Sequence, residues 1–189
     1  MTRVCVFGDS ITWGAWDFER GGWVSRLRYY FDNEKFDTFK FYNCGIDGDK
    51  VGDVLKRFDV EVEAREAEVV ILAIGINDSP HESYEGTGLD EFKNRFEELI
   101  RKSLAVTKCV IVVGLTNVDM DDKVFTDDSI KQYDDIVRAV ATQNDLPFVD
   151  VFGLMDETDL KFDGLHPEAD GHQKIADKVR DTLLQQKSA

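Results

Sequence analysis

The stretch Val69-Val70-Ile71-Leu72-Ala73-Ile74 contains only apolar residues. A strand of this composition is typical of the centre of a parallel sheet, where helices cover both faces. Four further apolar runs are long enough to form strands; they lie at Arg3–Phe7, Thr38–Asn43, Cys109–Leu115 and Pro147–Val151. We therefore expect about five parallel strands, with Glu68–Ile74 buried in the middle of the sheet.

Apolar residues at helical spacing fill the intervals between these runs. They are Trp23, Leu27, Tyr30 and Phe31; Val51, Val54, Leu55, Phe58 and Val62; Phe92, Phe96, Leu99 and Ile100; Ile130, Tyr133, Val137 and Val140; and Ile175, Ala176, Val179 and Leu183. The alternation of strands and helices predicts an α/β protein, a three-layer α/β/α sandwich with a parallel sheet in the middle. No internal repeat or Pro/Gly/Ser-rich linker interrupts it, so we expect residues 1–189 to form a single domain.

The charge balance limits the classes of partner. The 189 residues include 38 acidic and 23 basic ones, a formal net charge of -15, and no stretch is rich in Lys or Arg. Such a chain repels nucleic acids and anionic membranes, and no apolar run approaches the length of a membrane span. We expect no nucleic-acid partner and no stable membrane association. The sequence indicates no oligomeric state.

The cysteines and the N-terminus indicate a compartment. Cys5, Cys44 and Cys109 are an odd set without close spacing, which implies no disulfide framework and fits a reducing environment. The first expected strand begins next to Met1 and leaves no room for a signal peptide. We therefore expect a cytoplasmic protein.

Polar and glycine-containing segments follow several of the expected strands. In open α/β sheets, ligands bind beyond the carboxyl ends of the strands. The segments found there are Gly8-Asp9-Ser10, Asn43–Asp49, Gly75–Ser79 and, after the last strand, Asp163–Pro167. Each segment alone is explained by a turn or a helix cap. Their joint position at one edge of the sheet favours a catalytic site instead.

Ser10, Asp163 and His166 have the residue types of a nucleophilic site. A serine hydroxyl needs a base to take its proton, and the base needs a partner that fixes its tautomer. Asp163 precedes His166 by three residues, and a turn at Gly164 can bring the carboxylate to the imidazole. Pro167 suits the first turn of the closing helix and places His166 at its entrance. This combination predicts a serine hydrolase.

Donors for a developing oxyanion are available at two other strand ends. Asn77 brings a side-chain amide to the exit of the central strand, and such amides are effective oxyanion donors. The glycines after the second strand free the backbone, so that an N–H at Gly48 can face the same crevice. An Asx-turn at Asn77 and a simple turn at Gly48 are the structural alternatives.

The other two histidines have simpler explanations. His172 lies in line with the apolar residues of the last helix, and we expect it to be a partly buried packing residue. His81 follows Pro80 in the loop after the third strand, close to the expected site. Either it touches substrate or it is part of the loop surface, and the second is the commoner situation.

Aromatic residues follow the expected nucleophile. Trp13, Trp16 and Phe18 either line an apolar acyl pocket or pack the loop in which they lie. The stretches Ser79–Gly88 and Val118–Phe125 follow the third and fourth strands. Because loops at this edge surround the site, we expect these two stretches to determine specificity.

The four segments resemble the four blocks of the SGNH, or GDSL-type, hydrolase family. In chain order the resembling blocks are Gly8-Asp9-Ser10, Asn43–Gly48, Gly75-Ile76-Asn77-Asp78 and Asp163-Gly164-Leu165-His166. The chain departs from the family at Ile11, where Leu is frequent, and at Ile76, where Gly is frequent. The resemblance implies a flavodoxin-like sandwich and an esterase, thioesterase, lysophospholipase or carbohydrate acetylesterase that needs no metal or other cofactor.

The resemblance also implies individual roles. The implied catalytic residues are Ser10 as nucleophile, His166 as base and Asp163 as its orienting carboxylate, and the implied oxyanion donors are the Ser10 and Gly48 backbone N–H groups and the Asn77 side chain. Gly45 competes with Gly48, and the family's Asn-x-x-x-x-Gly spacing favours Gly48. The expected substrate is a small ester or thioester, cleaved through an acyl-enzyme. Transfer of the acyl group to an alcohol instead of water uses the same intermediate.

Alternatives from other classes use the same sandwich. A receiver-type switch with Mg²⁺ and a phosphorylated aspartate would use residues near strand ends, namely Asp9, Asp78, Thr116 and Lys161. It leaves Asn77 and the Asp163/His166 pair without a role. A phosphatase with an Asp nucleophile fits less well, because no Asp-x-Asp pair follows the first strand. A protein that only binds its ligand would not need every residue of the motif.

Overall fold

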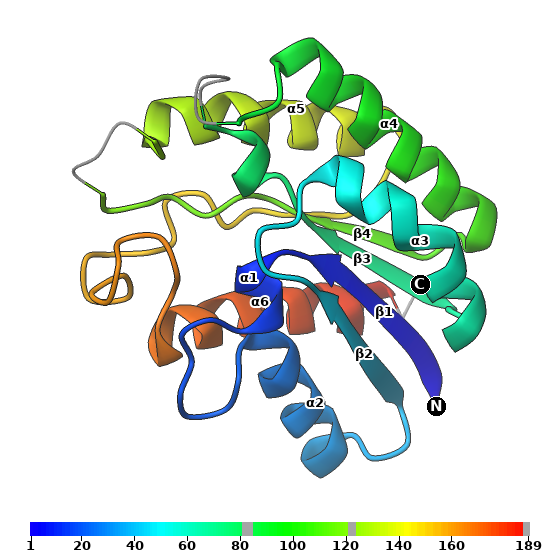
Figure 1. Cartoon of the computed structure of the whole chain (residues 1–189). Helices are drawn as coiled ribbons and strands as arrows, with labels where there is room; N and C mark the ends of the chain where they lie inside the picture. Colours follow the sequence, from blue (N-terminus) through cyan, green and yellow to red (C-terminus); the bar gives the residue numbers. More distant parts are fainter. Residues whose placement is uncertain (81–84, 121–123, 187–189) are drawn as a thin grey trace.

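The computed structural model describes residues 1–80, 85–120 and 124–186, and these contain a five-stranded parallel sheet (Figure 1). Its strands are β1 (Thr2–Gly8), β2 (Phe39–Gly45), β3 (Val69–Ala73), β4 (Val110–Val113) and β5 (Phe148–Val149), in the order β2-β1-β3-β4-β5. The apolar strand β3 pairs with β1 on one side and β4 on the other. Its central position is the one predicted from its sequence.

Helices cover both faces of the sheet. On one face lie α3 (Val51–Arg65), α4 (Leu89–Val106) and α5 (Asp127–Gln143); on the other lie α2 (Trp23–Glu34), α6 (Ala169–Gln186) and the short α1 (Ser10–Trp13) (Figure 1). A single 3₁₀ turn, η1 (Ile76–Asp78), follows β3. The expected three-layer α/β/α sandwich with a parallel sheet is confirmed.

The core lies between the sheet and the two helical layers. Strand β1 is buried from Val4 onward, and the apolar residues of the helices pack against the sheet. Burial of apolar area contributes about 25 cal/mol per Å² to folding. Of the predicted core residues in the helices, Tyr30 and Leu55 are only partly buried, because they lie at the margin of their helix's apolar stripe.

The strand bounds differ from the predicted ones by one or two residues at each end, and β4 has four residues instead of the expected Cys109–Leu115. Strand β5 has only two residues instead of the expected Pro147–Val151. The closing helix begins at Ala169, so Pro167 lies before it and not in its first turn, and His166 precedes the helix by three residues. The reason is local: the Glu168 N–H donates to the Asp159 carbonyl (2.7 Å), and the Pro167 carbonyl accepts the Trp16 N–H (3.3 Å). His166 is therefore held by a loop that folds back over α1.

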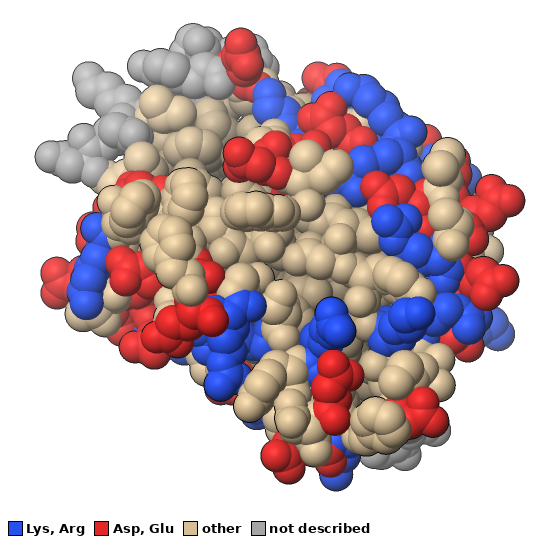
Figure 2. Space-filling model, turned by 60° about the horizontal axis from the view of Figure 1, so that its bottom comes forward, with Lys and Arg blue, Asp and Glu red and all other residues tan. Residues whose placement is uncertain are grey.

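The surface carries charges of both signs. On the face that Figure 2 shows, acidic and basic side chains occur side by side around the periphery, and much of the middle is uncharged. Exposed ion pairs also run along the helices, such as Arg95 with Glu91 and Lys93 with Glu97 in α4. Exposed pairs of this kind add about 0–1 kcal/mol each to stability. No helix in the described ranges combines the length and the apolarity needed to cross a bilayer.

Candidate active site

Ser10 lies where β1 turns into α1 at the carboxyl edge of the sheet. It is the first residue of α1, and the preceding Asp9 caps this helix by accepting the Ile11 N–H at 3.0 Å. The Thr12 hydroxyl donates to the Ala73 carbonyl of β3 (3.3 Å). These contacts anchor the short helix to the two central strands, so the position of the Ser10 hydroxyl is fixed by the sheet.

The structure brings Ser10, His166 and Asp163 together. Ser10 Oγ lies 2.8 Å from His166 Nε2, and His166 Nδ1 lies 2.6 Å from Asp163 Oδ2. The other carboxylate oxygen, Oδ1, accepts the backbone N–H groups of Leu165 (2.9 Å) and His166 (2.8 Å). This is the arrangement of nucleophile, base and orienting carboxylate that activates a serine hydroxyl.

The turn between Asp163 and His166 depends on Gly164. Its φ is 77°, in the left-handed region, and a Cβ there would lie 2.1 Å from the Asp119 carbonyl oxygen. The Asp119 N–H donates to the Gly164 carbonyl (2.7 Å), which fastens the turn to the segment after β4. Glycine is thus required both for the backbone conformation and for the close approach.

The local hydrogen bonds keep Asp163 ionised. Burial of this carboxyl disfavours its charge, but donors from the His166 backbone and ring, from Leu165 and from the Trp16 indole outweigh burial and lower its pKa to about 2. An ionised Asp163 requires the proton of His166 to be on Nδ1. The Nε2 lone pair then faces the Ser10 hydroxyl, as a general base must.

Two of the three predicted oxyanion donors, Asn77 and Gly48, lie in adjacent turns. Asn77, in η1, donates from Nδ2 to the Asp49 carbonyl at 3.0 Å, which ties it to the turn that contains Gly48. Gly48 has a φ of 76°, and no atom lies within 4 Å of the position of a Cβ there. Among the described residues, the backbone N–H groups of Ser10 and Gly48 are paired with no acceptor.

Gly45 is less suited to the oxyanion role than Gly48. Its N–H donates to Asn43 Oδ1 (2.9 Å), so it is already engaged. Asn43 Nδ2 in turn donates to the Thr12 carbonyl (2.8 Å). Asn43 therefore links the end of β2 to α1, a function that the sequence analysis did not assign to it.

Asp78 braces the oxyanion side. Its side chain is fully buried; Oδ2 accepts the Val51 N–H at the start of α3 (3.0 Å), and Oδ1 accepts the Thr87 hydroxyl (2.7 Å). Burial raises the pKa of this carboxyl, and the two hydrogen bonds oppose that shift. Asp78 joins η1, which carries Asn77, to the helix that follows Gly48.

Three aromatic rings form a shelf beside the His166 imidazole, and we call Trp16, Phe18 and Phe162 the aromatic shelf. The Trp16 ring lies 5.2 Å from Phe162, 6.1 Å from Phe18 and 5.9 Å from His166, measured between centroids. Phe18 and Phe162 are 79% and 60% exposed. Trp13 is also exposed, but none of its contacts with the described residues places its ring on the shelf. Sequence reasoning missed Phe162, although its position directly before Asp163 was an available signal.

The remaining histidines lie apart from this chemistry. His172 is completely buried, more so than expected: Nδ1 accepts the Trp23 N–H (3.2 Å), and Nε2 donates to the Ala15 carbonyl (3.0 Å). Burial lowers its pKa, so it is a neutral structural link between α6 and the segment after α1. His81 lies outside the described residues.

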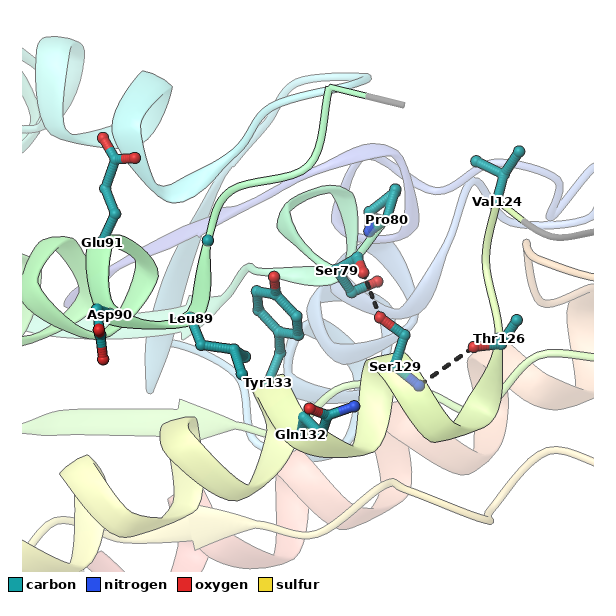
Figure 3. A pocket seen from close by; sticks show the side chains of 11 residues that line it. Ser79, Pro80, Leu89, Asp90, Glu91, Val124, Thr126, Ser129, Gln132 and Tyr133 are labelled. Atoms are coloured by element: carbon teal, nitrogen blue, oxygen red, sulfur yellow. Dashed lines mark hydrogen bonds between the residues drawn. The ribbon is translucent and has the colours of Figure 1, made fainter. Parts of the chain in front are cut away.

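A large open cavity lies apart from the triad and is not lined by it. It has a volume of about 890 Å³ and lies between the segment after η1 and the N-terminal half of α5 (Figure 3). Its lining includes residues from both predicted specificity stretches, namely Ser79, Pro80, Gly88 and Val124. The Ser129 hydroxyl of α5 donates to the Ser79 carbonyl and closes one side. Parts of both stretches, residues 81–84 and 121–123, lie outside the described residues.

The two acidic residues that a receiver-type site would need are engaged in structural hydrogen bonds. Asp9 caps α1, and Asp78 is saturated by Val51 and Thr87. Lys161 is exposed on the loop before Asp163. Within the described ranges, no group of three or more His, Cys, Asp or Glu side chains is arranged to hold a metal ion.

The chain is similar to a known family of hydrolases. The profile of the GDSL-like Lipase/Acylhydrolase family matches residues 6–174. An acetylxylan esterase of Geobacillus stearothermophilus is 25% identical over 147 residues, which cover 71% of this chain and 67% of that protein.

Solved structures share the fold over almost the full length. The acetyl xylan esterase AlAXEase superposes with a TM-score of 0.82 at 24% identity, covering 96% of this chain and 99% of its own. The acetylxylan esterase Axe2 of Geobacillus stearothermophilus has a TM-score of 0.79 at 22% identity, with 94% and 92% covered. An alpha/beta hydrolase enzyme from the metagenome of Lake Arreo, Spain, has 0.80 at 24% identity, with 94% and 93% covered.

Proposed function

We propose that this chain, which belongs to the GDSL-like Lipase/Acylhydrolase family and is a carboxylic ester hydrolase, works through an acyl-enzyme on Ser10. One observation carries the proposal: Ser10 Oγ, the two ring nitrogens of His166 and Asp163 Oδ2 form a continuous hydrogen-bonded chain with separations of 2.8 and 2.6 Å. The residues come from opposite ends of the sequence, so neither a local turn nor a helix cap accounts for the contact.

The first half of the reaction forms the acyl-enzyme. His166 Nε2 takes the Ser10 proton while Oγ bonds to the ester carbonyl carbon, and the carbonyl oxygen becomes an oxyanion. The imidazolium, stabilised by ionised Asp163, then gives that proton to the leaving alkoxide as the ester C–O bond breaks. The products of this half are a free alcohol and the acyl group esterified to Ser10.

The second half repeats the chemistry with water. His166 takes a proton from water, the hydroxide attacks the acyl carbon, and the bond to Ser10 Oγ breaks as the proton returns to it. In both halves of the reaction the oxyanion accepts hydrogen bonds from the Ser10 and Gly48 backbone N–H groups and from the second amide hydrogen of Asn77. Because the first amide hydrogen is bound to the Asp49 carbonyl, the direction of the second is set before substrate arrives.

For the substrate we propose acetyl or other short acyl esters of carbohydrates. The support is that relatives of this chain are named acetylxylan esterases. In addition, the exposed faces of Phe18 and Phe162 beside His166 suit the C–H groups of a sugar ring, since the face of an aromatic ring carries negative charge. The net charge of -15 disfavours anionic substrates.

Turnover of a p-nitrophenyl ester series from acetate to palmitate tests this function, run beside acetylated xylo-oligosaccharides and acyl-CoA. We expect acetate to be the best p-nitrophenyl ester, acetate release from the oligosaccharides, and no metal requirement. Ser10→Ala should lower kcat by at least about a thousandfold with an unchanged thermal midpoint. Turnover by folded Ser10→Ala on this panel would exclude the acyl-enzyme, and a preference for palmitate would exclude the short-acyl assignment.

A further inference from the structure

We propose that Trp16 is a positioning residue for the triad: its indole N–H holds Asp163 Oδ2 in the orientation that receives His166. The inference rests on the proposed acyl-enzyme function and extends the chain of side chains from Ser10, His166 and Asp163 to a fourth member. This role differs from both interpretations that the sequence offered for Trp16, an acyl-pocket wall and loop packing, because its indole N–H donates to the triad.

The geometry defines what Trp16 adds. Asp163 Oδ2 accepts both Trp16 Nε1 at 2.7 Å and His166 Nδ1 at 2.6 Å, while Oδ1 is held by two backbone N–H groups of its own turn. The backbone donors fix one oxygen only. Because Trp16 fixes the other independently of His166, the carboxylate cannot rotate about its Cβ–Cγ bond when the imidazole moves or becomes charged.

This support comes from a distant part of the chain. Trp16 lies 147 residues before Asp163, in the segment that follows the nucleophile helix α1. The backbone N–H of Trp16 also donates to the Pro167 carbonyl (3.3 Å). The backbone and the side chain of Trp16 together therefore hold the His166 loop against the Ser10 segment. A loop without regular secondary structure needs such a contact, because an error of about 1 Å in position can cost a hundredfold in rate.

The ring of Trp16 is itself held in place. It packs on Phe162 with centroids 5.2 Å apart and meets the His166 ring edge-on at 5.9 Å. Hydrogen bonds to an ionised acceptor are about twice as strong as neutral ones, and Asp163 is ionised, with a pKa of about 2. The aromatic shelf thus has two separable parts: the N–H of Trp16 serves the triad, and the exposed rings of Phe18 and Phe162 are available to substrate.

Loss of the N–H should have two effects on catalysis. The carboxylate would be less well oriented, which lowers kcat. It would also carry more unshared negative charge, which favours the imidazolium and moves the acidic limb of the pH profile upward. The other charged or titratable groups around the pair are His172 on α6, which interacts with His166, and the buried ion pair of Asp17 and Arg26 next to it.

Trp16→Phe, which keeps an aromatic ring and removes the donor, tests the proposal in the full-length protein with p-nitrophenyl acetate. We expect kcat to fall about 10- to 100-fold, KM to change less than about twofold, and the midpoint of the acidic limb of kcat/KM to rise by about half a pH unit. Trp13→Phe is the matched control, because Trp13 is exposed and makes no ring contact with the shelf among the described residues. It should leave that midpoint in place and change kcat by less than about twofold.

A double-mutant cycle with Asp163→Asn separates positioning from packing. If Trp16 acts through the Asp163 carboxylate, adding Trp16→Phe to Asp163→Asn should lower kcat by less than about twofold further. If the two residues act independently, the two losses in kcat should multiply in the double variant. Should Trp16→Phe fail to fold, incorporation of benzothienylalanine at position 16 keeps both rings and replaces N–H by sulfur. A wild-type kcat with a superimposable pH profile, or multiplicative losses in the cycle, would overturn the proposal. Failure of the acyl-enzyme function itself would appear separately, as turnover by Ser10→Ala.

Discussion

Asp163 and Asp78 lie at the same edge of the sheet, but their carboxyl groups differ in burial, in hydrogen-bond partners and in the direction of their pKa shift. Asp163 is 31% exposed on a loop, receives hydrogen bonds from rings and backbone, and has its pKa lowered to about 2. Asp78 is completely buried between η1 and α3, and burial raises its pKa. One carboxyl group is kept charged beside a base, and the other is used as an acceptor of structural hydrogen bonds.

This difference separates the site into two halves. The base half, with His166 and Asp163, depends on charge, because the imidazolium formed during the reaction needs an anion next to it. The oxyanion half, with Gly48 and Asn77, depends on geometry, because donors must point at the developing charge before it forms. Replacing Asp by Asn preserves the shape of the side chain and removes its charge. The change at Asp163 should therefore lower kcat more than the same change at Asp78, which braces the oxyanion half.

The largest effect is expected from Asp163→Asn. The amide would present an N–H to His166 Nδ1 and favour the wrong tautomer, which costs on the order of 10⁴ in kcat in serine proteases. The thermal midpoint should change little, because Asp163 is partly exposed. Steady-state kinetics on p-nitrophenyl acetate near pH 7 measure the loss, with Asp78→Asn as the partner variant. Equal losses in the two variants would contradict the division into halves.

Asp9 extends the comparison to stability. It is 3% exposed, and burial raises its pKa to about 7, although hydrogen bonds from nearby backbone N–H groups oppose that shift. The folded state therefore binds a proton that the unfolded state releases near pH 4, and folding stability falls as pH rises from about 4 to 7. The full shift corresponds to at most about 4 kcal/mol. Urea unfolding of wild type and Asp9→Asn should show the wild type losing stability relative to the variant across this window.

Asp17 is the opposite case and serves as the control for that measurement. Its ion pair with Arg26 and its backbone donors overcome the effect of burial and lower its pKa to about 2. It contributes stability that is present above about pH 4 and is lost as pH falls through about 2. Asp17→Asn should therefore alter the acid side of the stability profile. A profile of Asp9→Asn that runs parallel to the wild type between pH 4 and 7 would show that Asp9 stays ionised.

Asn77→Ala tests the oxyanion half. Removal of one oxyanion donor costs about 10²- to 10³-fold in kcat, with little effect on KM. Asn33→Ala is the control, because Asn33 is exposed and, within the described part of the chain, its amide donates to the Tyr29 carbonyl of its own helix. A loss confined to KM would mean that Asn77 binds the ground state and not the transition state.

Asp78→Ala should have the smallest of these effects, and one of a different kind. It leaves the buried Val51 N–H and the Thr87 hydroxyl without their acceptor, at a cost of about 1–3 kcal/mol in stability. Asp78→Asn retains an acceptor for Val51 and should lose less. Chemical unfolding measures both variants, and equal stability of the two would show that the acceptor retained by Asn contributes nothing to stability.

Much of the fold and of the site was predictable, for a physical reason. The short, β-branched-rich run Val69–Ile74 favours a buried strand, and the carboxyl ends of parallel strands meet at one edge of the sheet. Ser10, Asn77, Asp163 and His166 all follow strands in the sequence, so their convergence follows from topology.

Contacts between loops were not predictable from the same patterns. The bond from Trp16 to Asp163 joins residues 147 positions apart, and its direction depends on how a loop without regular structure folds. Complete burial of His172 likewise depends on two partners, the Ala15 carbonyl after α1 and the Trp23 N–H at the start of α2. Periodicity reports which face of a helix is apolar, but it carries no information about the partners of an indole or an imidazole.

The central claim is that Ser10 is the nucleophile, and covalent labelling tests it most directly. The wild-type protein would be treated with a fluorophosphonate, and the modified peptide identified by mass spectrometry. We predict one adduct, on Ser10, formed in step with loss of esterase activity and absent from Ser10→Ala. Inactivation with the adduct on another residue, or full esterase activity without any labelling, would contradict it.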